Sequence, residues 1–149
     1  MENLSPKARR KARMFAIQAL YQQQFNDLSI ADLQQQFLVE NPEIKADWAF
    51  FQKITREVLT HLTELDELFM PHLTRTTEEV NPVEKGILRL GTTELKHHPE
   101  TPYKVVINEY VELAKSFGAE AGHKFVNSVL DKVAAHARSI EKTHNQKEN

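Results

Sequence analysis

The stretch TPYKVVINEYVELAKSFG, residues 101–118, decides the fold class. A proline follows a capping threonine, apolar side chains recur every three or four positions, and a glycine stands where a left-handed helix end is expected. The apolar positions are Tyr103, Val106, Ile107, Tyr110, Leu113, Ala114 and Phe117. This spacing places them on one face of an α-helix. The stretch therefore predicts an amphipathic helix that buries one face against other elements.

Cap residues followed by apolar side chains at helical spacing recur on both sides of this stretch. The other predicted helix starts are Ser5-Pro6, Ser29, Asp47, Asn81-Pro82 and Gly122. The last of these helices is expected to bury Val126, Val129, Leu130, Val133, Ala137 and Ile140. The helix that starts at Ser29 should end at Asn41-Pro42. The long segment that opens at Asp47 is expected to be capped again at Thr63 and to bend or break at Pro71.

The sequence as a whole is therefore predicted to be all-α. It contains only four glycines and shows no period-two alternation, which argues against a β-sheet. We expect about six or seven helices. They should form one compact domain over residues 1–149, with a polar, frayed tail over about 141–149.

Composition excludes several classes of protein. With 27% charged and 40% hydrophobic residues, the sequence is typical of a globular protein. The absence of cysteine excludes disulfides, thiolate nucleophiles and cysteine-ligated metal centres, and it fits a reducing cytoplasm. No segment has the apolar length of a membrane span or the apolar core of a signal peptide. A cytoplasmic protein without a membrane segment is predicted.

Motifs for catalysis, metal binding or cofactor binding are not found. Seven histidines are present, but none forms HExxH, and His97-His98 adjoin a helix end, where the helix dipole accounts for them. There is no glycine-rich phosphate loop and no G-x-S-x-G elbow. Glu78 and Glu79 lie in a polar connector where nothing favours a raised pKa. We therefore expect no enzyme, no metal site and no cofactor.

Charge is distributed unevenly along a sequence whose formal net charge is -2. Residues 7–13 read KARRKAR, so five cations stand against Glu2 near the N-terminus. Acidic residues prevail over residues 26–48 and again over residues 56–84. This asymmetry suggests a polyanionic partner at one place and a basic protein partner at another. Solvated helix faces are the simpler alternative for both kinds of cluster.

A helical projection of the first predicted helix gives the basic cluster a context. Its alanines share one face, and Arg10, Ile17 and Tyr21 lie roughly opposite, flanked by Arg13 and Met14. Guanidinium groups pair with phosphates and an aromatic ring offers a surface for base stacking, as single-stranded nucleic acid requires. Alternatively, Ile17 and Tyr21 pack under a neighbouring helix and the cations are merely solvated.

Phe125 is a second aromatic candidate. It lies about 100° from the centre of the apolar face of the last predicted helix, between Lys124 and Lys132. An aromatic ring at the edge of a core can pack against it or stack on a base. Packing is the simpler of the two readings when this residue is taken alone.

Three blocks resemble the NusB family of bacterial transcription antitermination factors. They are ARRKARMFAIQALYQ, NPVEKGILRLGTTEL and PYKVVINEYVELAKSFGAEAGHKFVNSVLDK, in family order and over nearly the whole sequence. The resemblance implies an all-helical fold of two small packed bundles. It also implies binding of boxA RNA together with the ribosomal small-subunit protein NusE. That complex joins RNA polymerase and suppresses termination, notably in ribosomal RNA synthesis.

The resemblance also implies roles for individual residues. Contact with RNA phosphates falls on Lys7, Arg9, Arg10, Lys11 and Arg13. Further RNA-binding candidates are Tyr21, Lys124 and Phe125. The NusE-facing surface maps to the central helices near Glu84, with Glu78 and Glu79 in the segment before it. An acidic patch there would suit a basic ribosomal protein.

One position and one short segment depart from the family pattern. Ala121 stands where many relatives carry an aspartate, so a negative charge is missing beside the expected RNA site. Residues 75–79 read RTTEE where relatives carry RLLEE, which makes part of the expected NusE-facing region more polar.

Three other functions are compatible with parts of this pattern. A helical protein-interaction adaptor would use the basic helix on an acidic partner without RNA. A NusB-like domain of an RNA methyltransferase would be expected to precede a glycine-rich cofactor domain, and the sequence reaches Asn149 without one. A helix-turn-helix DNA regulator has weaker support, because no short unit with a polar recognition face is present.

Overall fold

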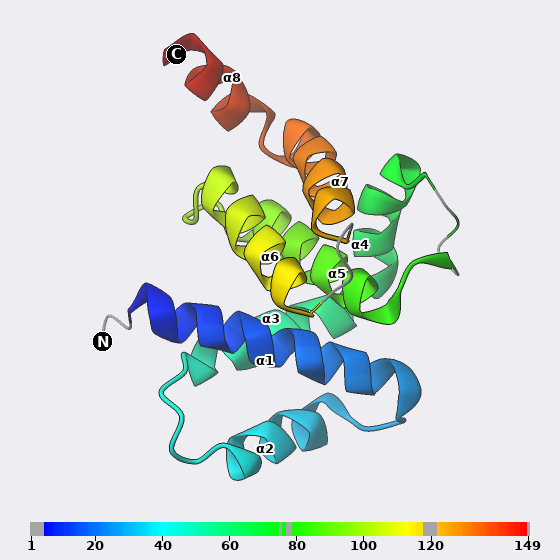
Figure 1. Cartoon of the computed structure of the whole chain (residues 1–149), viewed down its shortest axis with the longest axis vertical. Helices are drawn as coiled ribbons and strands as arrows, with labels where there is room; N and C mark the ends of the chain where they lie inside the picture. Colours follow the sequence, from blue (N-terminus) through cyan, green and yellow to red (C-terminus); the bar gives the residue numbers. More distant parts are fainter. Residues whose placement is uncertain (1–4, 75, 77–78, 118–121, 149) are drawn as a thin grey trace.

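The computed structural model describes residues 5–74, 76, 79–117 and 122–148, with side chains as far as residue 143. These residues form eight α-helices and one short 3₁₀ helix, and no strand occurs among them (Figure 1). In chain order the elements are α1 Pro6–Phe25, α2 Ile30–Glu40, α3 Trp48–Thr60, α4 Leu62–Phe69, η1 Met70–His72, α5 Pro82–His97, α6 Tyr103–Phe117, α7 Gly122–Ala137 and α8 Ser139–Glu148. The predicted all-α class is confirmed. The helices exceed the expected six or seven because the C-terminal tail is helical as well.

Four helices begin at predicted cap residues whose side chains accept a hydrogen bond from the first turn. Ser5 Oγ accepts from the N–H of Ala8 at 3.1 Å, Ser29 Oγ from Asp32 at 3.1 Å, Asp47 Oδ1 from Phe50 at 3.1 Å and Asn81 Oδ1 from Val83 at 2.8 Å. Each bond satisfies one backbone donor that a helix start leaves unpaired. Local side chains thus set these four starts.

The segment that opens at Asp47 breaks at a different residue from the one expected. It lies at His61, between α3 and α4, and Thr63 is an exposed residue inside α4 rather than a cap. The N–H of His61 donates to the carbonyls of both Glu57 and Val58, at 3.1 and 3.2 Å, so α3 tightens and ends there. Pro71 follows later, within η1.

The C-terminal tail is helical rather than frayed as far as Glu148. Contacts hold the first turn of α8: Glu141 accepts from the backbone N–H of Tyr103 at 3.0 Å, and Lys142 Nζ donates to Asp131 at 3.0 Å. Ile140 was expected in the core, but it is 87% exposed. The buried face of α7 therefore does not continue into α8.

The helices form two packed groups that share α5. One group contains α1, α2 and α3, and in the other α4, α6 and α7 pack around α5 (Figure 1). Because α5 also contacts α1 and α3, one continuous apolar core runs through both groups. Leu88, Leu90 and Leu95 of α5 are fully buried in it. The two small bundles implied by the resemblance are present.

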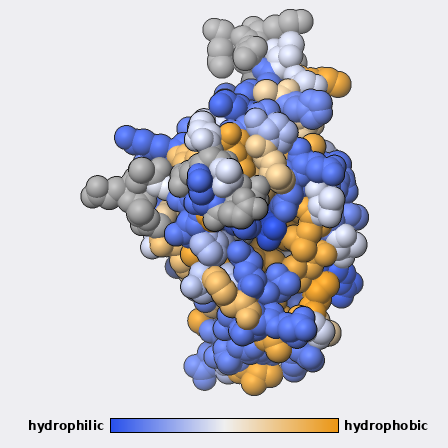
Figure 2. Space-filling model, turned by 90° about the vertical axis from the view of Figure 1, so that its right-hand side faces the viewer, coloured by the Kyte–Doolittle hydropathy of each residue, from blue (hydrophilic) through white to orange (hydrophobic). Residues whose placement is uncertain are grey.

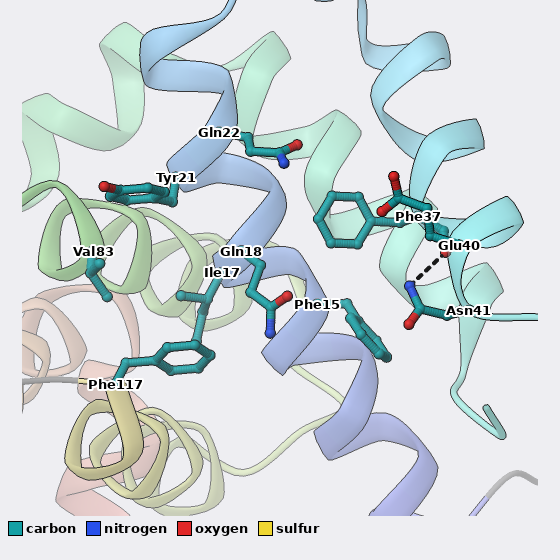
Figure 3. Close-up of a pocket in the computed structure, with 10 residues that line it drawn as sticks. All are labelled: Phe15, Ile17, Gln18, Tyr21, Gln22, Phe37, Glu40, Asn41, Val83 and Phe117. Atoms are coloured by element: carbon teal, nitrogen blue, oxygen red, sulfur yellow. Dashed lines mark hydrogen bonds between the residues drawn. The ribbon is translucent and has the colours of Figure 1, made fainter.

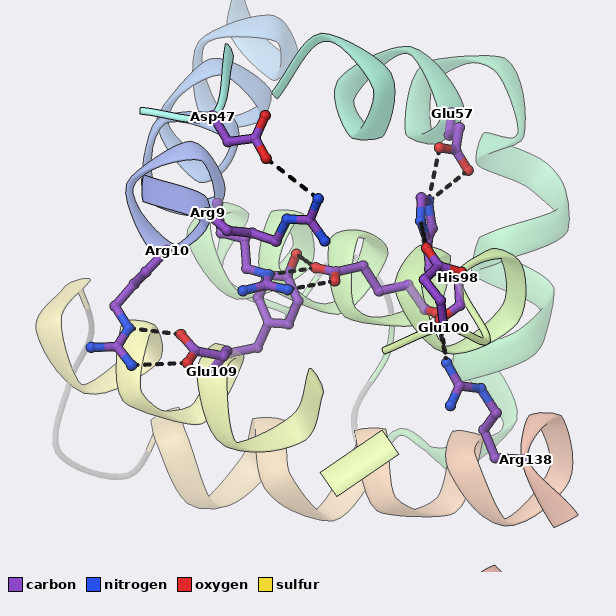
Figure 4. A network of polar contacts seen from close by, with 11 residues as sticks. Arg9, Arg10, Asp47, Glu57, His98, Glu100, Glu109 and Arg138 are labelled. Carbon is purple, nitrogen blue, oxygen red and sulfur yellow. Dashed lines mark hydrogen bonds and ion pairs between the residues drawn. The ribbon is translucent and has the colours of Figure 1, made fainter. Parts of the chain in front are cut away.

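Two buried side chains hold the C-terminal end of α5. The guanidinium of Arg138 donates to the backbone carbonyls of Leu95, Glu94 and His98, at 2.6, 3.1 and 2.8 Å. The ring nitrogens of His98 lie 2.9 Å from the Glu57 carboxylate and 3.0 Å from the Glu100 carboxylate (Figure 4). The bond from Arg138 satisfies the carbonyl of Leu95, which has no backbone donor because the residue four positions on is Pro99, and the other two bonds add to backbone bonds that Glu94 and His98 already accept. These contacts also tie α5 to α3 and to the end of α7.

Hydrophilic residues cover most of the face that lies to the right in Figure 1, with hydrophobic residues in a few patches between them (Figure 2). None of the helices that the structure describes is long and apolar enough to cross a membrane. Among the same residues, no group of three or more His, Cys, Asp or Glu side chains could hold a metal ion.

Candidate nucleic-acid interface

Helix α1 carries most of the residues that the sequence assigned to RNA binding. At 1.5 Å per residue its 20 residues span about 30 Å. Four buried alanines, Ala8, Ala12, Ala16 and Ala19, allow α1 to pack closely against its neighbours α3 and α5. The helix is therefore held rigidly along its inner face, and its outer face is left for binding.

Arg13 does not reach the surface, which corrects the expected phosphate contact at this position. Its side chain is buried, and its Nε and Nη2 donate to the two carboxylate oxygens of Glu94, both at 2.8 Å. The hydroxyl of Tyr110 donates to the same carboxylate. Burial opposes the charge of Arg13, but the Glu94 carboxylate more than offsets it and raises the pKa of Arg13. Arg13 is an internal partner that joins α1 to α5.

Arg9 and Arg10 lie at the surface, and each already has a carboxylate partner (Figure 4). Arg9 Nη2 donates to Asp47 at 3.3 Å, and its guanidinium carbon lies 4.2 Å from the centre of the Phe50 ring. Arg10 Nε and Nη2 donate to Glu109 at 2.8 and 2.9 Å, and its side chain is 55% exposed. Arg10 can therefore present its outer edge to a phosphate, whereas Arg9 is turned toward α3.

Lys7 and Lys11 are the cations of the cluster that no described residue neutralises. Lys7 is exposed and Lys11 is half-buried, and neither forms an ion pair within the described chain. Helical spacing places them on one line with the outward residues further along α1. We call this line the outer stripe; it consists of Lys7, Lys11, Met14, Gln18, Tyr21, Gln22 and Phe25. Cations thus begin the stripe, amides occupy its middle and aromatic rings end it.

Tyr21 ends the outer stripe together with an aromatic residue that the sequence analysis missed. Tyr21 is 43% exposed, and the centre of its ring lies 5.1 Å from that of Phe25, which is 63% exposed. The i, i+4 spacing was the signal that could have identified Phe25. Ile17 is buried instead, because it points toward Phe117 of α6 and Val83 of α5 (Figure 3). The packing alternative therefore holds for Ile17 and not for Tyr21.

The two candidates on α7 have different surroundings. Lys124 is exposed, and it makes no hydrogen bond or ion pair in the described chain. Phe125 is partly buried and packs against the apolar core. The position of Phe125 fits the packing reading directly, and the residue stays partly exposed. Ala121, the departure from the family pattern beside it, lies outside the described residues.

The acidic residues expected to contact a protein partner also differ in their exposure. Glu84 is only 8% exposed in the first turn of α5, where the helix dipole favours a negative charge. A Cβ atom at Gly122 would lie 2.8 Å from Oε1 of Glu84, so the start of α7 closes over this carboxylate. Glu84 is therefore a largely buried carboxylate, and its contact with a protein partner stays a prediction. Glu79 is exposed, whereas Glu78 lies outside the described residues.

Comparison with known proteins identifies the family. The model of the NusB family matches residues 10–135. A Transcription antitermination protein NusB from Pseudoalteromonas translucida (strain TAC 125) is 50% identical over 135 residues, which cover 91% of this chain and 99% of that protein. A protein of the same description from Shewanella halifaxensis (strain HAW-EB4) is also 50% identical over 135 residues, covering 91% of this chain and all of that protein.

Solved structures of NusB proteins share the fold of this chain. A structure described as T. maritima NusB superposes with a TM-score of 0.79 at 29% identity, covering 95% of this chain and 99% of that one. A crystal structure of antitermination factors NusB and NusE in complex with dsRNA gives a TM-score of 0.80 at 26% identity, covering 89% and 99%. On the sequence match, the relatives and the shared fold together, this chain belongs to the NusB family.

Proposed function

We propose that this chain is a transcription antitermination factor that binds boxA RNA together with NusE and joins the RNA polymerase antitermination complex, notably in ribosomal RNA synthesis. In this proposal it is a cytoplasmic binding protein without a catalytic role. The relatives at 50% identity are described as transcription antitermination proteins, and a similar structure holds NusB, NusE and RNA. The observation that carries the proposal is the outer stripe of α1, where unpaired cations and exposed aromatic rings share one face.

The residues of the interface take separate roles. Lys7, Lys11 and the exposed edge of Arg10 hold phosphates, which positions the RNA without reading its sequence. Tyr21 offers a ring for base stacking, and Lys124 and Phe125 extend the surface on α7. Arg9 at the surface and Arg13 in the core are held by carboxylates of the protein itself, Asp47 and Glu94.

The test is RNA binding across a salt series, with a boxA oligonucleotide and a scrambled one of the same composition. The double substitution Lys7→Ala/Lys11→Ala should lower the affinity for both RNAs to a similar degree. The slope of log affinity against log salt should flatten by about 1.4, since each lost phosphate contact on a single strand is worth about 0.7. The matched control is Lys45→Ala/Lys53→Ala, which removes two exposed lysines away from the stripe. Absence of binding to both RNAs would favour the adaptor alternative, and equal binding of the boxA and scrambled RNAs by the unaltered protein would contradict recognition of boxA.

Binding of NusE is proposed to use the exposed acidic residue rather than the buried one. Glu79→Lys should lower affinity for NusE and leave the melting temperature unchanged, because the side chain is exposed. Glu84→Lys should lower the melting temperature as well, because it places a cation under α7 at the positive end of α5. Loss of NusE binding by Glu84→Lys at an unchanged melting temperature would contradict this division of roles.

A further inference from the structure

A groove of about 580 Å³ lies over the middle of the outer stripe. Gln18 and Gln22 of α1 form its floor (Figure 3). One wall is the end of α2, with Phe37 and Asn41, and the other is formed by Val83 of α5 and Phe117 of α6. Tyr21 stands at its edge. The groove is thus built from four helices around one face of α1.

The floor of this groove offers planar hydrogen-bonding groups. Gln18 is half-buried, and its side-chain amide makes no hydrogen bond to another residue in the described part of the chain. The oxygen of Gln22 accepts a long bond of 3.4 Å from Gln36, while its NH₂ group makes no bond there. A primary amide presents donors and an acceptor in one plane, which is the pattern that pairs with the edge of a nucleobase.

The charge of the groove favours a base over a phosphate. Glu40 carries the one acidic group, and no basic side chain is present, among the described residues that line it. A phosphate would be repelled by this carboxylate and would find no cation, whereas a neutral base is indifferent to the charge. Aromatic and aliphatic side chains on the walls suit the faces of a flat ring.

The groove lies next to the cations of the outer stripe, on the same side of α1. Lys11 and Gln18 are seven residues apart, so they share one side of α1 at a separation of about 10 Å along the axis. A strand whose phosphates lie on Lys7 and Lys11 therefore passes directly to the amides. The exposed ring of Tyr21, one turn further on, lies at the edge of the same groove, where it can meet the face of a base held there.

We propose that this groove holds an unpaired nucleobase of the bound RNA, with Gln18 hydrogen-bonding the edge of the base and Tyr21 stacking on its face. The inference rests on the proposed RNA binding and deepens it, because it separates the residues that read sequence from those that hold the backbone. Gln18 is the residue that determines specificity.

The first test compares Gln18→Ala with Gln35→Ala, a matched change at an exposed glutamine of α2 outside the groove. Affinities are measured for the boxA oligonucleotide and for variants with one base changed at a time. Gln18→Ala should lower boxA affinity by about 5- to 100-fold, remove discrimination at one position and leave the salt slope unchanged. Gln35→Ala should match the unaltered protein in all three respects.

The second test uses the absence of cysteine from the sequence. Gln22→Cys introduces a single thiol at the floor of the groove, and Gln35→Cys is its control. Each is mixed with boxA RNA that carries a disulfide-tethered base, moved along the strand one position at a time. Crosslinking at one position, or at two adjacent positions, and only with Gln22→Cys is the expected result.

The outcomes separate this inference from the proposed function. If the unaltered protein does not prefer boxA RNA, the proposed function fails. If it prefers boxA and the Lys7 and Lys11 changes act as expected, but Gln18→Ala behaves like Gln35→Ala, the groove inference is overturned. It is also overturned if Gln18→Ala weakens NusE binding instead of RNA binding, because the occupant is then a protein segment.

Discussion

Lys11 and Arg13 stand two positions apart in one basic cluster, yet they have different surroundings. Lys11 reaches solvent, whereas Arg13 crosses into the core to meet Glu94, a residue 81 positions away in sequence. A projection of α1 alone places both near the outer face, because it cannot show which neighbour carries a buried carboxylate. Charge counts along a sequence therefore overstate the number of cations available to a ligand.

Removal of Arg13 tests this division. Arg13→Ala leaves the buried carboxylate of Glu94 without its cation, so the free energy of unfolding should fall by about 3–5 kcal/mol. Lys11→Ala should change it by less than about 0.5 kcal/mol. Urea denaturation measures both. Similar losses for the two variants would mean that the Arg13–Glu94 pair stabilises the protein no more than a lysine at the surface does.

The ion pair between Arg10 and Glu109 predicts a pH dependence. The hydrogen bond from Arg10 holds the pKa of Glu109 below its usual value, although burial acts in the opposite direction. A carboxylate with a lowered folded-state pKa stabilises the protein above its unfolded-state pKa, and that stability is lost as the pH falls through the folded-state pKa. The melting temperature of the unaltered protein should therefore fall more than that of Glu109→Gln between pH 6 and pH 3. If the melting temperatures of the two proteins fall in parallel with pH, the Arg10–Glu109 pair does not contribute to the pH dependence of stability.

At the scale of elements, the helix starts could be predicted from sequence and several helix ends could not. Ser5, Ser29, Asp47 and Asn81 act on backbone groups two or three residues away, so local sequence contains the information. The break at His61 has no proline or glycine to mark it. The ordered start of α8 depends on partners in α6 and α7, which no local pattern reveals. The groove was missed for the same reason, because its walls come from helices that are distant in sequence.

Arg138 allows a test at the end of α5. Arg138→Ala removes three hydrogen bonds to buried carbonyls, and the bond to Leu95 has no backbone replacement because the residue four positions on is Pro99, so the free energy of unfolding should fall by about 2–4 kcal/mol. Arg138→Lys should restore less than half of the loss, because one ammonium group cannot reproduce the fork of a guanidinium. Chemical denaturation of the three proteins provides the comparison. Full recovery with lysine would show that charge alone matters there.

At the scale of the whole molecule, the two helix groups should unfold together because α5 belongs to both cores. Trp48 is the only tryptophan, and it lies in α3, so its fluorescence reports on the first group. Far-ultraviolet circular dichroism reports on all helices. The two signals should give the same urea midpoint, as a two-state transition requires. An earlier midpoint for Trp48 would mean that the first group opens independently.

The shared position of α5 has a consequence for amide hydrogen exchange. Exchange of its backbone amides requires opening that disrupts both groups, so these amides should be among the slowest in the protein. A ligand bound only on α1 raises the free energy of every opening that releases it. Amides in the last turns of α7, away from Lys124 and Phe125, that exchange through global opening should then be protected by bound RNA, with no change in the conformation of α7.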